Sequence, residues 1–316
     1  MRRFLLRGGE LLAVLFVVSF GVFAMITLMP GDPAVSILGE GHPPEAYAEL
    51  RQELGLNDPL LSRYWDWLSG AVTGDLGNSL VPPQSDVVDR ILGAFPVSLQ
   101  LAVMGLVLAL LLAVPLAMWS ASHAGGAVDR IISASMFATL SVPSFLAGLI
   151  LIMVFANGLG WFPRAQWVRL GEDPIGNLHH ALLPAFVIAL TELALFTRIL
   201  RNDLITTLNE DYILAARAKG MPPWRIMVTD ALRPSSFSLV TLMGLSLGRL
   251  IGSTVIVEYL FALPGMGSMI ITAANQGDFP LVQGAVLVIA IAYVAINATI
   301  DASYGYLDPR TRRVHA

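Results

Sequence analysis

The chain has 316 residues, of which 55% are hydrophobic and only 13% are charged, and its mean hydropathy is +0.69. Several apolar runs reach about 20 residues, the length that crosses the hydrocarbon core of a bilayer, so a soluble protein is excluded and an all-α integral membrane protein is predicted. The net charge is −4, and because the chain has no cysteine, disulfides and thiolate metal sites are excluded.

The first predicted element is an apolar run that ends at Met29 and follows a basic N-terminus. A signal peptide also begins with positive charge, but this run is long and leads into Pro-Gly-Asp-Pro without a small-residue cleavage site. We therefore expect an uncleaved first transmembrane helix at 10–29, so that residues 1–29 comprise the N-terminal tail and the first span.

The next segment, residues 30–93, is too long for a simple hairpin loop. Pro43 and Pro44 open a short amphipathic helix, and a second helix follows from Leu60. Tyr64 and the two tryptophans beside it are typical of a membrane interface. The segment carries ten acidic side chains against three arginines. It is either a solvated cap over the membrane helices or a docking surface for a soluble partner.

Five further apolar runs complete a set of six predicted spans; they cover 95–119, 131–157, 181–200, 236–256 and 281–301. The prolines inside them, Pro115, Pro143 and Pro184, are expected to kink or end their helices. These runs predict a five-helix core at 94–301, followed by a tail at 302–316.

The basic residues predict the orientation of these spans. With the N-terminus inside, thirteen basic residues fall in the inner segments and five in the outer segments. Because cytoplasmic loops carry an excess of arginine and lysine, both termini are expected in the cytoplasm. The longest inner loop is then 198–235, and residues 302–316 form a cytoplasmic tail.

Motifs for catalysis are missing from the sequence. The single lysine, Lys219, is followed by Gly220 rather than Ser or Thr, so the chain has no nucleotide-binding P-loop. The five histidines form no His-Glu-x-x-His pair, and no Gly-x-Ser-x-Gly elbow is present. We therefore expect no enzyme activity, no metal site, no bound cofactor and no nucleic-acid partner.

Three ionisable residues fall in or beside the predicted spans: Glu192, Arg249 and Glu258. A charge in hydrocarbon costs several kcal/mol, so such groups usually face a pore or a partner. Glu192 and Arg249 lie near the middle of their spans. They either pair with each other or line the path of a solute, and the sequence leaves both open.

The inner loop contains a short basic helix. Its pattern runs from Asp211 through Lys219 and includes three alanines, which favour a helix and add little bulk. Gly220 suits a left-handed C-cap, and Pro222-Pro223 stops the helix. Such a helix can approach a protein partner closely or lie along lipid headgroups, and these residues fit both.

The loop resembles the "EAA" loop of permease subunits in bacterial ABC importers, whose pattern is E-A-A, three spacers, Gly, nine spacers, then I-x-L-P. The positions that fit are Ala215, Ala216, Gly220 and Leu232. The departures are Leu214 for the glutamate, Asp230 for the isoleucine, and a proline one residue late at Pro234. The form Ala-Arg-Ala-Lys-Gly is similar to that of the dipeptide/oligopeptide branch.

Other motifs extend the resemblance over most of the chain, in an order and spacing that make it specific. They are Met29-Pro-Gly-Asp-Pro-Ala34, Leu50–Leu56, Gly74-Asp-Leu-Gly77, Ser141–Phe145, Val257–Phe261, Pro264-Gly-Met-Gly267 and Asp278-Phe-Pro280.

The resemblance implies a type I ABC importer permease fold in a bacterial inner membrane. Two separate ATPase subunits would bind ATP and magnesium, a related but different second permease would complete the path, and an extracytoplasmic binding protein would deliver peptides. The residues implied in coupling to the ATPase are Asp211, Tyr212, Ala215, Ala216, Arg217, Ala218, Lys219, Gly220 and Met221.

The resemblance also implies a re-entrant turn near an outer gate. The gate or path candidates are Glu192, Arg249, Glu258, Phe261, Pro264, Gly265 and Gly267. The alternative substrates within the same family are nickel, glutathione and haem. The alternative from another class is an ion-coupled secondary transporter, which the lack of an internal repeat disfavours.

Overall fold

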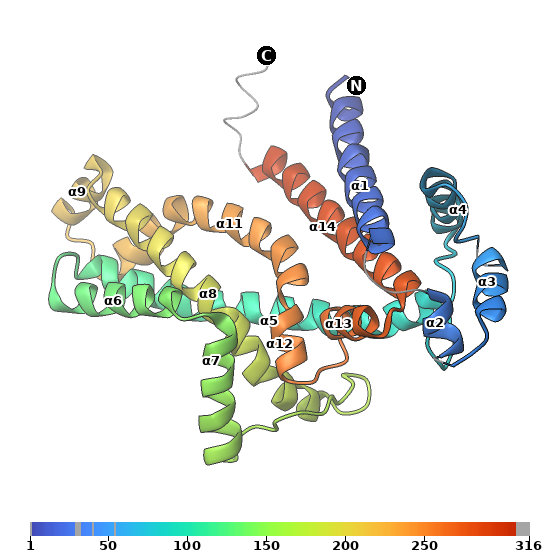
Figure 1. Ribbon diagram of the computed structural model, residues 1–316. Helices are drawn as coiled ribbons and strands as arrows, with labels where there is room; N and C mark the ends of the chain where they lie inside the picture. The colour runs from blue at the N-terminus through green and yellow to red at the C-terminus, as the bar shows by residue number, and fades with distance from the viewer. Residues whose placement is uncertain (1, 29–32, 40, 54, 308–316) are drawn as a thin grey trace. The chain divides into compact units, whose positions relative to one another are not determined.

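The computed structural model describes residues 2–28, 33–39, 41–53 and 55–307. Within these ranges the regular structure is helical, and a single isolated bridge pairs Asn78 with Asp86. The chain divides into two compact units: Met1–Ser98 with Pro264–Ala295, and Leu99–Leu263 with Ile296–Ala316. Helices α5 (Val87–Ser122) and α14 (Phe279–Leu307) each contribute to both units (Figure 1).

The first unit contains the predicted outer segment. Its remaining helices are α1 (Arg2–Leu28), α2 (Pro33–Leu38), α3 (Pro44–Glu53), α4 (Leu60–Thr73) and α13 (Met266–Gln276). The two helices expected after Pro43 and from Leu60 are α3 and α4. Val87, Ile91, Met266 and Leu281 are buried together in its core. Close packing is required there, since a Cβ on Gly284 would lie 2.7 Å from Val87.

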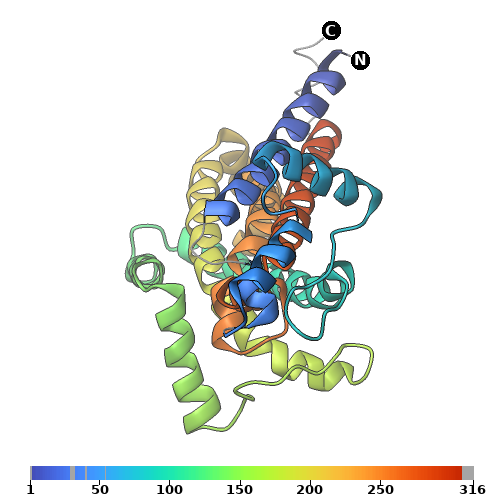
Figure 2. The same ribbon diagram turned by 45° about the vertical axis from the view of Figure 1, so that its right-hand side comes forward.

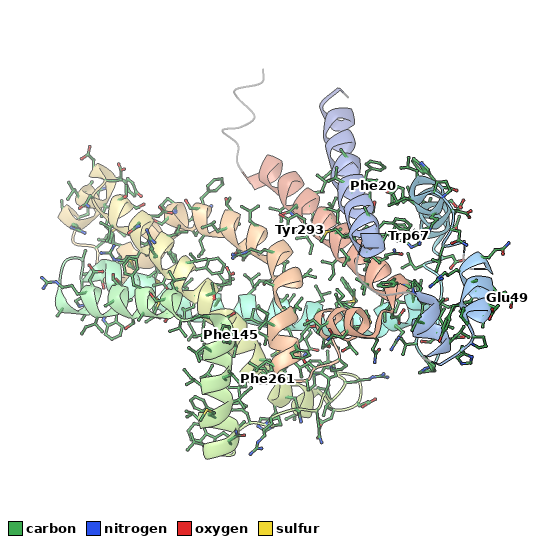
Figure 3. The ribbon with its side chains drawn as sticks, viewed as in Figure 1. Phe20, Glu49, Trp67, Phe145, Phe261 and Tyr293 are labelled. Atoms are coloured by element: carbon green, nitrogen blue, oxygen red, sulfur yellow. The ribbon has the colours of Figure 1, made fainter. Side chains whose placement is uncertain are left out.

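Tyr64, which the sequence suggests for a membrane interface, is buried inside this unit. Its side chain is 1% exposed, and its ring meets Phe20 and Phe23 of α1 edge-on. Its hydroxyl forms a 2.8 Å hydrogen bond with Ser19, so the polar end is satisfied inside the unit. Figure 3 labels Phe20 on α1 and Trp67 on α4, the two helices that Tyr64 joins.

The second unit is built around α8 (Pro174–Leu208), which contacts several neighbours and has buried residues along most of its length. The other helices are α6 (Ala127–Ser141), α7 (Ser144–Leu151), the π-helix η1 (Ile152–Gly158), α9 (Asp211–Ala218), α10 (Pro223–Arg225), the π-helix η2 (Ile226–Ala231), α11 (Leu232–Ser253) and α12 (Val255–Leu260). Small residues let helices approach α8: a Cβ on Gly105 would lie 2.6 Å from Ile188.

The three span prolines behave differently. Pro143 separates α6 from α7, and the two halves of this predicted span are bent by 102°. Pro115 and Pro184 lie inside α5 and α8, which continue through them. A proline only removes one hydrogen bond and crowds the preceding turn, and packed neighbours in a membrane bundle can hold the helix together.

Four helical stretches are long and apolar enough to cross a membrane: Val87–Ser122, Pro174–Leu208, Pro223–Ser253 and Phe279–Ile300. The bent pair Ala127–Ser141 and Ser144–Gly158 is a fifth candidate, and Ala13–Thr27 is a shorter apolar helix. The described helices therefore support an all-α, multi-pass membrane protein. The motif residues 29–32 and the tail residues 308–316 lie outside the described ranges.

Candidate functional site

The segment after α8 forms the short helix that the loop sequence predicts. α8 ends at Leu208, and α9 covers Asp211–Ala218 beyond its C-terminal end (Figures 1 and 2). The end of α9 is a Schellman motif, in which the amide of Gly220 donates to Arg217 at 2.9 Å and that of Met221 to Ala216 at 3.2 Å. Gly220 has φ +76°, so the predicted left-handed cap is confirmed.

Most side chains of α9 are exposed to solvent. Ile213 is the one buried residue of this helix, and it anchors α9 against the adjoining helices. The predicted coupling residues are distributed as follows: Asp211, Tyr212, Ala215, Arg217, Ala218, Lys219 and Gly220 are exposed, and Ala216 and Met221 are half-buried. The set therefore lies on one short helix and the turn after it, and we call its exposed part, which includes Ala215, Arg217, Ala218, Lys219 and Gly220, the α9 surface.

A groove of about 680 Å³ borders the α9 surface. One wall comes from the end of α5, including Met118 and Trp119. The other includes Met221 and Trp224 from the turn into α10, and Trp224 is 70% exposed. Large exposed apolar side chains beside a basic helix are typical of a surface that meets another protein.

Two hydrogen bonds join the helices around α9, one from α9 to η2 and one from α11 to α8. The hydroxyl of Tyr212 donates to the carbonyl of Asp230 at 3.3 Å. In a regular helix that carbonyl would be bonded to residue 234, which is a proline without an N–H. The hydroxyl of Ser235 in α11 donates to Thr207 at the end of α8 at 2.8 Å. Desolvation, with the charges of Glu210 and Asp230, raises the pKa of Tyr212, so its hydroxyl remains a donor at neutral pH.

A buried ionic network holds the turn between α5 and α6. Asp129, 4% exposed, accepts from Arg201 Nε at 2.5 Å and Nη2 at 2.6 Å. It also accepts from the Ser120 hydroxyl at 2.6 Å and the Gly125 amide at 2.8 Å. Asp129 in the first turn of α6 is thereby linked to α8. Asp129 was not among the residues predicted from the sequence, because its partner Arg201 lies 72 positions away along the chain.

The structure pairs two of the predicted path residues. Glu192 lies near the middle of α8 and is 2% exposed. It accepts from Arg249 Nη2 at 2.5 Å and from the Ser246 hydroxyl at 2.7 Å. The Arg249 side chain is 54% exposed, so the pair is buried at its acidic end and open at its basic end.

The remaining gate candidates belong to different units. In the second unit, Glu258 is fully buried and accepts from the Thr254 hydroxyl at 2.6 Å, and Phe261 is 2% exposed. In the first unit, Pro264 is exposed, Gly265 is the N-cap of α13, and Gly267 is buried in its first turn. The candidates are thus divided between the two units and do not form one site within either of them.

Asp278 is a second residue whose role sequence reasoning missed, although it belongs to a quoted motif. It is fully buried in the first unit and accepts from the Ser79 hydroxyl, and from the Leu80 amide at 3.0 Å. Arg90 lies 3.4 Å away. The described ranges contain no group of three or more His, Asp or Glu side chains placed to hold a metal ion.

Comparison with known proteins places these features in one family. Residues 113–313 match the family of binding-protein-dependent transport system inner membrane components, and residues 1–102 match its N-terminal membrane component.

Individual relatives cover almost the whole chain. The oligopeptide transport system permease protein AppB of Bacillus subtilis is 34% identical over 290 residues, covering 91% of this chain and 92% of the relative. The glutathione transport system permease protein GsiC of Escherichia coli is 33% identical over 306 residues, covering 96% of each chain. The di/tripeptide transport system permease protein DppB of Pseudomonas aeruginosa is 32% identical over 327 residues, covering 97% of each.

Proposed function

The chain belongs to the family of binding-protein-dependent transport system inner membrane components and is a permease subunit of a peptide ABC importer, and from this premise we propose how its parts serve transport. The proposal gives it six spans, both termini in the cytoplasm, and a place in a bacterial inner membrane beside a related but different second permease. ATP and magnesium would be bound by two separate ATPase subunits, so this chain itself would carry no catalytic site.

The observation that carries the proposal is the exposed α9 surface. Ala215, Ala218 and Gly220 leave little bulk on its open side, so another backbone can approach closely. Arg217 and Lys219 supply positive charge for acidic groups on that partner. We assign α9 as the coupling helix that sits on an ATPase subunit, with the neighbouring groove as part of the contact.

Contacts around α9 connect this helix to the long helices α8 and α11. Ile213 and the Tyr212–Asp230 hydrogen bond hold α9 against η2, and η2 in turn packs against α11. The Ser235–Thr207 bond joins α11 to α8. When ATP draws the ATPase subunits together, displacement of α9 would therefore move α8 and α11 as packed bodies between inward-open and outward-open states.

The outer segment would receive the binding protein. Its described acidic side chains are exposed; they are Glu45, Glu49, Asp58, Asp66, Asp75, Asp86 and Asp89. This supports a negative docking surface in place of a purely solvated cap, because clustered charge speeds and orients the encounter of two proteins. The turn from Glu258 to Gly267 would serve the outer gate, and the Glu192–Arg249 pair would line the path.

Within the family, the E. coli relative named for glutathione favours one second candidate substrate. Glutathione is itself a tripeptide, so both substrates share a peptide backbone and a free carboxylate. Nickel and haem lack this support among the relatives cited.

The test is uptake by proteoliposomes that contain this chain, the second permease, both ATPases and the binding protein. We expect peptide uptake that requires ATP and survives collapse of a proton gradient. Ala215→Trp should abolish uptake and ATPase binding, whereas Ala48→Trp, also on an exposed helical position, should not. Uptake that persists without ATPase subunits and collapses with the proton gradient would instead identify an ion-coupled transporter.

A further inference from the structure

Arg249 has hydrogen-bonding capacity that the fold does not use. Its Nη2 donates one of its two N–H groups to Glu192, while the second N–H of Nη2 and those of Nε and Nη1 have no hydrogen-bond partner among the described residues. Both carboxylate oxygens of Glu192 are satisfied, one by Arg249 and the other by Ser246. The guanidinium is thus fixed at one end and presents a free edge at the other, where the side chain is 54% exposed.

This free edge opens on one face of α11. Leu245, Arg249 and Gly252 are spaced by four and three residues, so they lie on one side of the helix, and all three are exposed. Ser253 beside them is also exposed. A Cβ on Gly252 would meet no atom within 4 Å, so the space next to Arg249 is open.

The position of this face excludes lipid as its neighbour. Glu192 holds the guanidinium beside the middle of α8, where an arginine facing hydrocarbon would cost several kcal/mol. Although Leu245 shares this face, the guanidinium on it therefore meets water or another polar surface. In the proposed importer, this is what a solute path provides.

The chemistry that fits the free edge is a carboxylate. The second N–H of Nη2 is parallel to an N–H of its neighbour, Nε or Nη1, and such a pair matches the two oxygens of a carboxylate, a geometry that an amine or an amide does not offer. Every peptide with a free C-terminus carries this group whatever its side chains are. Because Glu192 already offsets the charge of Arg249, the attraction is moderate, which suits a site that must also release its ligand.

We propose that Arg249, held in place by Glu192 and Ser246, is a transient binding site for the C-terminal carboxylate of the transported peptide. This inference rests on the proposed function, since it names the part of the substrate that the path recognises. It assigns Glu192 and Ser246 as positioning residues for Arg249 rather than as substrate contacts.

The absence of cysteine from the chain allows a direct test. Gly252→Cys introduces a thiol on the Arg249 face, in a solubilised complex whose other subunits have no reactive cysteine and to which no binding protein is added. Two peptides with free termini carry the same thiol-reactive group, one on the C-terminal side chain and one on the N-terminal side chain. The C-terminal label should react about tenfold faster, the advantage expected of a charge-assisted hydrogen bond.

Controls separate recognition from simple access. A C-terminal amide should lose the advantage in the same Gly252→Cys complex, and this comparison requires no change at Arg249. Phe237→Cys, at an exposed position of α11 twelve residues before Arg249, should show no preference between the labels. In the Gly252→Cys background, Arg249→Met should remove the preference. The double change Glu192→Gln with Arg249→Met, which leaves no unpaired buried carboxylate, should assemble and still show no preference.

Several outcomes would overturn the inference. Equal labelling by both peptides, or equal labelling by the acid and the amide, would show that Arg249 does not recognise the carboxylate. Recovery of the preference in the double variant would show that the pair is only structural. Cross-linking of the thiol introduced at position 252 to the second permease, in place of peptide, would place the face in a subunit contact. A wild-type complex that imports no peptide with ATP would refute the proposed function itself, a separate result.

Discussion

Replacing Asp129 with Asn should weaken the corner between α5 and α6. The change keeps the shape of the side chain but removes its charge and turns one acceptor into a donor that faces Arg201 or Gly125. Asp129 makes four hydrogen bonds at 2.5 to 2.8 Å and is 4% exposed, so no water replaces what is lost. A buried ion pair broken on one side costs about 3–5 kcal/mol.

Arg201 retains some contact with water, with a side chain that is 23% exposed, so the lower end of that range, about 3 kcal/mol, is expected. The assay is denaturant unfolding of the purified chain in detergent. Asp129→Asn, Arg201→Met and the double variant form a cycle in which the double change should cost less than the sum of the single changes. Because the corner forms one wall of the groove beside α9, Asp129→Asn should also reduce ATPase binding.

Asp66→Asn, at an exposed position in α4, is the matched control and should stay within about 0.5 kcal/mol of the wild type. If Asp129→Asn behaves like this control, or if the three variants are additive, the network does not hold the corner and the reasoning fails.

Gly220→Ala should lower the free energy of unfolding by about 1 kcal/mol through backbone strain at its positive φ alone, since a Cβ there meets no atom. It should also lower peptide-stimulated ATPase activity. Gly74→Ala has the same strain at the end of α4 and should leave ATPase activity unchanged; equal effects would contradict the role of α9. Tyr212→Phe removes the donor to the Asp230 carbonyl and should lower ATP-driven uptake while the complex still assembles; full uptake would show that this bond transmits nothing. Asp278→Asn should increase amide hydrogen exchange at residues 79–90, because it weakens the interactions of Asp278 with Ser79, Leu80 and Arg90. Unchanged protection of this segment would show that Asp278 does not hold it in place.

Local chain chemistry made the α9 region predictable. Alanine-rich sequence favours a helix, Gly220 tolerates a left-handed cap, and adjacent prolines block continuation, so the helix and its C-terminal end followed from residue types within a dozen positions. The apolar runs likewise predicted where the long helices lie. Pro143 ended a helix as expected, whereas Pro184 did not, because the outcome depends on the neighbours that pack against each helix.

Interactions between residues far apart in the sequence were harder to predict. Tyr64 is a residue type that is common at membrane interfaces. Its burial depends on the packing of α4 against α1, which the sequence does not show. The Asp129–Arg201 pair joins positions far apart in the sequence, and no local pattern marks it. For Glu192 and Arg249 the sequence left open whether they pair or line a path. Only the structure shows that they form an ion pair and that the Arg249 side chain is exposed.

The central claim is that α9 sits on a separate ATPase subunit. Ala215→Cys places a unique thiol on the exposed α9 surface, and Ile175→Cys, at a position that is 82% exposed at the other end of α8, is the control. A short cross-linker applied to the assembled complex should join the thiol introduced at position 215, and not the one at position 175, to an ATPase subunit. An intact, ATP-hydrolysing complex of the Ala215→Cys variant in which no such link forms would contradict the account.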